Sequence, residues 1–174
     1  MNDFTNYDTT QEQSIQSQPH NKQAEEAILG SVLINPESYF DVAQIIEADN
    51  FYVIRNRWIW EVYTHLHEDR IPIDLLTVSE ELEKRNQLQE IGGQAYLLSL
   101  MNQTPSSMNA EAYAHIVEET SIRRRMLGAA NEMAKLAYDQ EKSVNSVLDE
   151  AEREVFNLSE KRIRRDLQPI QSVL

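Results

Sequence analysis

The segment from Ala110 to Tyr138 constrains the fold of this chain more than any other part of it. It contains no proline and one glycine in 29 residues, so nothing in it stops a helix. A helix of this length extends for roughly 45 Å, at about 1.5 Å per residue. The sequence therefore predicts one long helix over this segment.

The residues that follow predict a second helix that turns back along the first. Residues 139–142 have the composition of a tight reversal, and Ser143 can cap a new helix. A candidate seam follows the three-and-four spacing of a coiled coil, which indicates a helical hairpin. Its members are Tyr113, Ile116, Thr120, Arg123, Leu127, Ala130, Ala134 and Ala137, then Val144, Leu148, Ala151, Val155 and Leu158.

Other apolar residues of the hairpin fall beside this seam or opposite to it. Ile122, Met126, Val147 and Phe156 form a second apolar stripe, which the preceding globule is too small to cover together with the first. The stripe has two possible uses, which periodicity alone does not separate. It can mediate self-association through a two-fold contact, or it can pack on the globule of the same chain.

The part of the chain before the hairpin predicts several shorter helices. Asn21 can cap the first, and Asn35 followed by Pro36 can cap the second, which would turn Phe40, Ala43 and Ile46 inward. Three further features are a buried helical face (Trp58, Ile59, Val62, Tyr63, Leu66), a capping box at Thr77–Glu80 and a chain break at Gly92–Gly93. The fold class is therefore all-α.

The composition excludes several functional classes. Four glycines in 174 residues are too few for a turn-rich β-sandwich, and none lies in a phosphate-binding G-x-x-x-x-G-K-[ST] loop. The absence of cysteine excludes a disulfide scaffold and a thiolate metal site. No arrangement of histidines, carboxylates or nucleophiles forms a catalytic constellation, so we expect no catalytic, cofactor or metal site in this chain.

The net charge of −13 disfavours DNA binding by this chain alone. Residues 21–110 carry fourteen acidic and six basic side chains, whereas residues 111–174 carry twelve and ten, so the acidity belongs to the globule. Residues 1–20 form a polar tail that we expect to be disordered, and no apolar run is long enough to cross a membrane. Two basic runs remain, Arg123–Arg125 and Lys161–Arg165, for which solvated surface is the default interpretation.

Several segments together resemble one family, the amino-terminal domain of the bacterial replicative DNA helicase of the DnaB type. They are Pro19–Asn21, Ala24–Gly30, Asp49–Tyr52, Arg57–Trp60, Pro72–Val78, Gly92–Leu97, Pro105–Ser107, Ala112–Glu119, Ile122–Arg125 and Leu148–Glu152. Their order and spacing cover nearly everything after the tail. One departure is Glu68–Ile71, where family members usually have a glycine before the Pro-Ile-Asp segment.

The resemblance implies a compact six-helix globule followed by a hairpin, and hairpins that pair so that six copies form a trimer-of-dimers collar. It implies that primase docks on this collar and that a helicase loader is a further partner. It also implies that ATP and Mg²⁺ bind a separate RecA-like motor domain, which would contact DNA and would make the full-length protein an ATP-dependent helicase. We accordingly expect a truncated piece of a cytoplasmic, nucleoid-associated replication protein.

The expected organisation is a tail (1–20), a globule (21–106), a hairpin (107–160) and the start of a linker (161–174). The hairpin residues expected to contact a second copy or primase are Ile116, Ile122, Arg123, Arg124, Met126, Leu127, Met133, Tyr138, Val144, Val147, Leu148 and Val155. The alternative function is a freestanding helical adaptor or regulatory protein of the replication machinery, because a fold does not specify a function.

Overall fold

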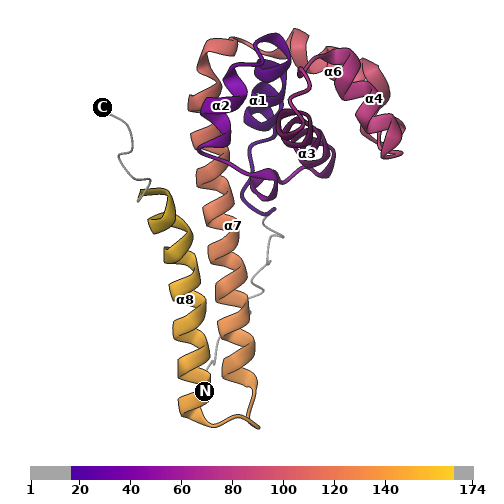
Figure 1. Cartoon of the computed structure of the whole chain (residues 1–174). Helices are drawn as coiled ribbons and strands as arrows, with labels where there is room; N and C mark the ends of the chain where they lie inside the picture. The colour runs from indigo at the N-terminus through magenta and orange to yellow at the C-terminus, as the bar shows by residue number, and fades with distance from the viewer. Residues whose placement is uncertain (1–16, 167–174) are drawn as a thin grey trace, which may run out of the picture.

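The computed structural model describes the backbone of residues 17–166 and the side chains of residues 17–158. Over these residues the chain is helical and contains no strand, so the all-α prediction is confirmed. The elements are α1 (Lys22–Ile34), α2 (Ser38–Ala43), η1 (Ala48–Asn50), α3 (Ile54–Glu68), α4 (Leu75–Lys84), α5 (Leu88–Ile91), α6 (Gly93–Gln103), η2 (Ser107–Asn109), α7 (Ala110–Tyr138) and α8 (Val144–Asp166). The shorter helices gather around one half of α7, and the other half projects with α8 beside it (Figure 1).

Helix α1 is the centre of the globule. It packs against α2, α3, α6 and α7, and Ile28, Leu29 and Val32 are fully buried. Its N-terminus is capped as predicted, because the Asn21 side chain accepts a hydrogen bond from the backbone N–H of Ala24. Gly30 lies where α1 crosses α6, and a Cβ atom there would collide with the carbonyl of Leu100 and the hydroxyl of Thr104. The absence of a side chain at residue 30 thus permits this close crossing.

Helix α2 begins later than predicted. Asn35 does not cap it with its side chain; its backbone carbonyl instead accepts from Ser38 N at 3.0 Å, in a turn that precedes the helix. This delay shifts the inward face by one residue. Ile46 is buried as predicted, but Phe40 and Ala43 are exposed, and Tyr39 and Val42 are buried in their place.

The predicted buried face of α3 is confirmed at Ile59, Val62, Tyr63 and Leu66, and Trp58 packs partly buried against the core. Trp60 is a further, fully buried residue of this helix. The predicted cap of the next helix, by contrast, is wrong. Helix α4 is capped by Asp74 rather than Thr77, because the Asp74 carboxylate accepts from the N–H groups of Leu76 and Thr77, both at 2.9 Å. The Thr77 hydroxyl completes the capping box by accepting from Asp74 N at 3.1 Å. The acidic cap three residues upstream adds a first turn to the helix.

The turn after α3 forms without the glycine that the resemblance led us to expect there. Arg70 adopts a left-handed conformation with φ of 58°, and the N–H of Ile71 reaches back to the Leu66 carbonyl at 2.8 Å. A non-glycine residue in this conformation costs about 1–2 kcal/mol. The tight turn at the end of α3 therefore forms although the backbone of Arg70 is strained. By contrast, the predicted break after α5 does use glycine, with φ of 105° at Gly92.

The long helix of the hairpin and the start of its second helix lie where the sequence predicts them. Helix α7 covers Ala110–Tyr138, and α8 begins at Val144, where the Ser143 hydroxyl accepts from Ser146 N. The first turns of α7 belong to the globule, since Ala114 and Val117 are fully buried against its core. Near the hairpin turn, Lys142 forms a hydrogen-bonded ion pair with Glu150, which raises the pKa of Lys142 and lowers that of Glu150.

The predicted seam is wrong in its choice of face. Leu127, Ala130, Ala134 and Ala137 are exposed, as are Val144, Leu148 and Val155. The less exposed positions of the projecting hairpin include Ile122, Arg125, Ala129, Met133 and Leu136 on α7, and Val147, Ala151, Glu154 and Leu158 on α8. Both stripes have coiled-coil spacing, but the larger side chains on the inner α7 stripe offer more apolar area to bury than three alanines do. The stripe expected inside is thus largely outside.

The two chain ends also differ in part from their expected organisation. Helix α8 extends to Asp166, so the predicted linker starts as a continuation of this helix. Pro19 and His20, expected within the tail, lie on the globule, and the His20 ring stacks on Tyr52 with centroids 4.4 Å apart. The predictions for residues 1–16 and 167–174 lie outside the described residues.

Substituting Gly30 by alanine should destabilise the protein by about 2 kcal/mol or more, because the new methyl group must displace the backbone of α6. Thermal unfolding should show a melting temperature lower by several degrees. The matched control is Gly128→Ala on α7, where a Cβ meets nothing within 4 Å. That change should leave stability unchanged or raise it by up to about 1 kcal/mol, from helix propensity. Equal melting of the two variants would contradict the tight crossing.

Candidate partner-binding surfaces

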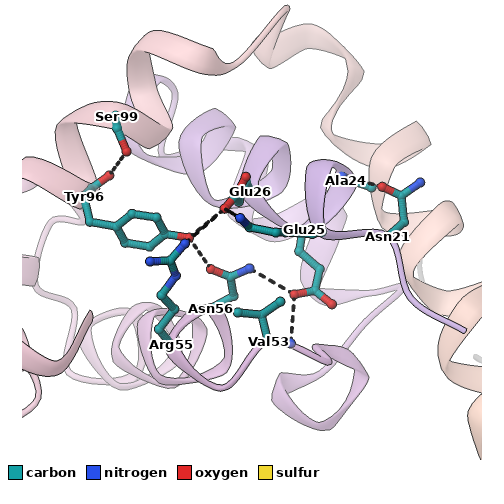
Figure 2. A network of polar contacts seen from close by, with 10 residues as sticks. Asn21, Ala24, Glu25, Glu26, Val53, Arg55, Asn56, Tyr96 and Ser99 are labelled. Carbon is teal, nitrogen blue, oxygen red and sulfur yellow. Dashed lines mark hydrogen bonds and ion pairs between the residues drawn. The ribbon is translucent and has the colours of Figure 1, made fainter. Parts of the chain in front are cut away.

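A buried carboxylate fixes the start of α3 against α1. Glu25 is 1% exposed, and it accepts hydrogen bonds from Tyr52 N at 2.7 Å, Val53 N at 3.2 Å and Asn56 Nδ2 at 3.0 Å. Helix α3 has no side-chain cap of its own at Val53, so Glu25 supplies acceptors for orphan N–H groups (Figure 2). The burial of a charge is tolerated because three donors surround it.

The same network continues to α6. Tyr96 donates to Asn56 Oδ1 at 2.7 Å or to Glu26 Oε1 at 3.1 Å, and the Arg55 guanidinium lies 3.8 Å from the centroid of the Tyr96 ring (Figure 2). Burial and the nearby carboxylate of Glu26 raise the pKa of Tyr96, so its hydroxyl stays a donor. Helices α1, α3 and α6 are thereby held in one arrangement. Neither Glu25, Asn56 nor Tyr96 was predicted for this role; the one signal was an acid beside the apolar face of α1.

A second polar cluster holds α7 to the globule. Arg124 donates to the Pro19 carbonyl at 2.8 Å and to the Asn50 carbonyl, and its guanidinium lies 5.4 Å from the centroid of the Tyr52 ring. Asn50 in turn donates to the buried hydroxyl of Ser121 at 2.9 Å. Arg124 thus joins the start of the globule, η1 and α7, although the sequence singled it out for partner contact. The neighbouring Arg123 is different, because it forms an exposed ion pair with Glu119 at 2.7 Å.

The projecting hairpin carries an apolar groove, which we call the hairpin groove. Its lining consists of Met133, Leu148, Ala151, Glu152, Val155 and Phe156. Leu148 is 57% exposed, Val155 50% and Phe156 61%, so large apolar side chains of α8 face solvent in this chain. Covering this surface with another apolar surface would lower the free energy, in proportion to the apolar area removed from water.

The sequence-predicted contact residues fall into three groups. Met133, Leu148 and Val155 line the hairpin groove, while Ile122, Val147 and Arg124 are half-buried within the chain. The remaining ones, Ile116, Arg123, Met126, Leu127, Tyr138 and Val144, are exposed along the hairpin. Ile116 also lines a cleft of about 400 Å³ between α1, α6 and α7. Phe156 was not among the predicted contact residues, although the second apolar stripe contained it.

Residues 17–158 contain no group of three or more histidine, aspartate or glutamate side chains placed to hold a metal ion. Among the described helices, none is both long enough and apolar enough to span a membrane.

The arrangement defines a helical domain with a projecting, partly apolar hairpin. The family described as DnaB-like helicase N terminal domain matches residues 17–119, which is more than half of the chain. The chain therefore belongs to this family.

Curated relatives agree with this assignment. The chain is 39% identical over 145 residues to the replicative DNA helicase DnaB of Haemophilus influenzae, a match that covers 83% of this chain and 31% of that protein. It is 34% identical over 156 residues to the replicative DNA helicase DnaC of Bacillus subtilis, covering 90% of this chain and 34% of that protein. The chain thus spans about a third of the length of these relatives.

Solved structures support the same fold. The N-terminal domain of DnaB helicase from Mycobacterium tuberculosis superimposes with a TM-score of 0.75 at 29% identity, over 81% of this chain and 99% of that one. The N-terminal domain of DnaB helicase from Helicobacter pylori, described together with its interactions with primase, gives a TM-score of 0.58 at 26% identity. That match covers 67% of this chain and 90% of the other.

Arg124→Ala should lower the free energy of unfolding by about 2 kcal/mol, because two carbonyls lose a charged donor. The matched control is Arg123→Ala, which removes only an exposed ion pair and should cost less than about 0.5 kcal/mol. Urea unfolding followed by circular dichroism measures both variants. Equal losses would mean that Arg124 does not hold the junction between α7 and the globule.

Proposed function

We propose that this chain is the assembly and primase-docking domain of a hexameric, ATP-dependent replicative DNA helicase. The observation that carries the proposal is the hairpin groove, whose large apolar side chains lie half-exposed on a helix that projects from the globule. Membership of the DnaB-like N-terminal family supports it. In this proposal the groove is covered by a second copy of the chain, and the exposed α7 residues receive primase.

Self-association through the hairpin follows from its geometry. Both helices continue well beyond the globule, so their outer faces have no cover from the rest of the described chain (Figure 1). A two-fold contact would place the grooves of two copies face to face. Each copy would then contribute its own Leu148, Val155 and Phe156 to the buried interface. Pairs of this kind are the units from which we propose that the hexamer is built.

The primase part of the proposal rests on the Helicobacter pylori domain, which is described with its interactions with primase and shares this fold. The exposed apolar residues Met126 and Leu127 lie on α7 between the globule and the hairpin groove. Exposed aliphatic side chains can bind the apolar face of a partner helix, because they make few contacts within their own chain that would have to be broken.

The remaining parts of the proposal concern the longer protein. Curated relatives about three times as long are replicative DNA helicases, and we place ATP and Mg²⁺ binding, and most DNA contact, in the portion that this chain does not match. A helicase loader is a further proposed partner. The protein would act in primosome formation, with the replication machinery in the cytoplasm.

Leu148→Asp should shift the chain from dimer to monomer, because the two-fold contact would bury a new carboxylate without a partner. The monomer itself should melt nearly unchanged, since Leu148 is 57% exposed. Sedimentation equilibrium at tens of micromolar measures the mass, with Asn145→Asp as the exposed control on the same helix. A wild type that is strictly monomeric would count against the proposed pairing.

Met126→Asp should reduce retention of the cognate primase by at least tenfold, if the exposed methionine becomes a buried contact worth about 1.4 kcal/mol or more. The chain's own melting temperature should not change, because Met126 is 56% exposed. The control is Asn131→Asp, an exposed position on the same helix that adds the same charge. Equal retention of primase by the two variants would remove this face of α7 from the docking site.

A further inference from the structure

A second groove lies on the globule, between α2, η1 and α3, and we call it the acidic groove. It has a volume of about 320 Å³. Its floor is apolar and is formed by the nearly buried side chains of Tyr39, Ile46 and Trp60. The Tyr39 and Trp60 rings stack with centroids 5.2 Å apart, so the floor is rigid. This groove is separate from both surfaces assigned above.

Carboxylates form the rim of the acidic groove. Glu61 and Glu68 lie two turns apart on one side of α3, and Glu47 comes from the segment before η1. Within the described residues, none of these three carboxylates has a lysine, arginine or histidine at ion-pair distance. His65, which also lines the groove, faces Asp69 and Glu81 instead. An apolar floor with an acidic rim fits a long cationic side chain, whose stem packs below while its charge stays at the rim.

The chain itself contains a segment with the complementary chemistry. Residues 161–165 read Lys-Arg-Ile-Arg-Arg, four cations around one apolar side chain. The globule is acidic, with fourteen acidic and six basic side chains over residues 21–110. Each copy of the chain therefore carries both the acidic groove and a cationic segment outside it.

Assembly beyond a dimer needs a contact of this second kind. A two-fold contact through the hairpin groove is complete when two copies have met, because it uses the same patch on both. Growth to six copies requires a second contact, and two different surfaces, one from each neighbour, can supply it. We propose that residues 161–165 of one copy dock in the acidic groove of a second copy. This inference rests on the proposed assembly function and names a contact between its dimers.

Disulfide trapping tests the contact directly, because the natural chain contains no cysteine. Two full-length single-cysteine variants are mixed, Thr64→Cys in the acidic groove and Ile163→Cys in the cationic segment. Mild oxidation should give a mixed disulfide between the two variants. A mass tag on one variant distinguishes this product from disulfides between two copies of the same variant. The control partner is Met108→Cys, which is 93% exposed and lies outside the acidic groove. We expect several times more mixed disulfide with Thr64→Cys than with this control.

Charge reversal provides the second arm. Glu61→Lys with Glu68→Lys should abolish the selective cross-link, and Arg164→Glu with Arg165→Glu on the partner variant should restore it. The cross-link should also weaken at about 1 M salt, where the screening length falls to about 3 Å. Equal trapping by the Thr64 and Met108 variants would overturn the proposal, and so would trapping that ignores charge reversal.

The test of the acidic-groove contact can fail or succeed independently of the test of hairpin pairing. Sedimentation of the Glu61→Lys and Glu68→Lys variant should still show dimers, because these residues lie outside the hairpin groove. Loss of the dimer in Leu148→Asp with the charge-dependent cross-link retained would support both contacts. A wild-type monomer that still cross-links selectively would reject hairpin pairing alone. A double variant, Thr64→Cys with Ile163→Cys, that closes only within its own chain would overturn docking between copies.

Discussion

The buried carboxylate of Glu25 is the interaction on which the rest of the structure depends. It is almost inaccessible to water and accepts three hydrogen bonds, two of them from the backbone at the start of α3. A charge so placed is tolerated only while all three donors stay in position, so it fixes the distance between α1 and α3. Through Asn56 and Tyr96 the same constraint reaches α6. The globule is therefore a rigid base for the hairpin.

The rigidity of the globule matters because the hairpin projects from it. The first turns of α7 lie in the core, and Arg124 ties the next turn to carbonyls at Pro19 and Asn50. Beyond this point α7 and α8 have mainly each other for support. Their direction is thus set at the junction, while their outer apolar faces remain available. A contact surface on a long arm keeps its orientation only if its base is fixed in this way.

Local signals in the sequence were sufficient for much of this fold. The long helix and the reversal follow from the absence of breakers and from Ser143, and the Asn21 cap and the Gly92 break were also predicted. Errors arose where two patterns of equal period compete. The hairpin has two stripes with coiled-coil spacing, and only the packed volume of the side chains decides which is inside. Glu25 was missed because its three donors come from residues 52–56, a pairing that no local pattern encodes.

The hairpin groove and the acidic groove lie in different parts of the chain, and this separation bears on the proposed assembly. The hairpin groove is apolar, whereas most of the net charge lies on the globule. An apolar groove gives affinity without strong dependence on salt, and an acidic rim gives selectivity that salt weakens. Contacts of the two kinds can therefore be gained or lost independently.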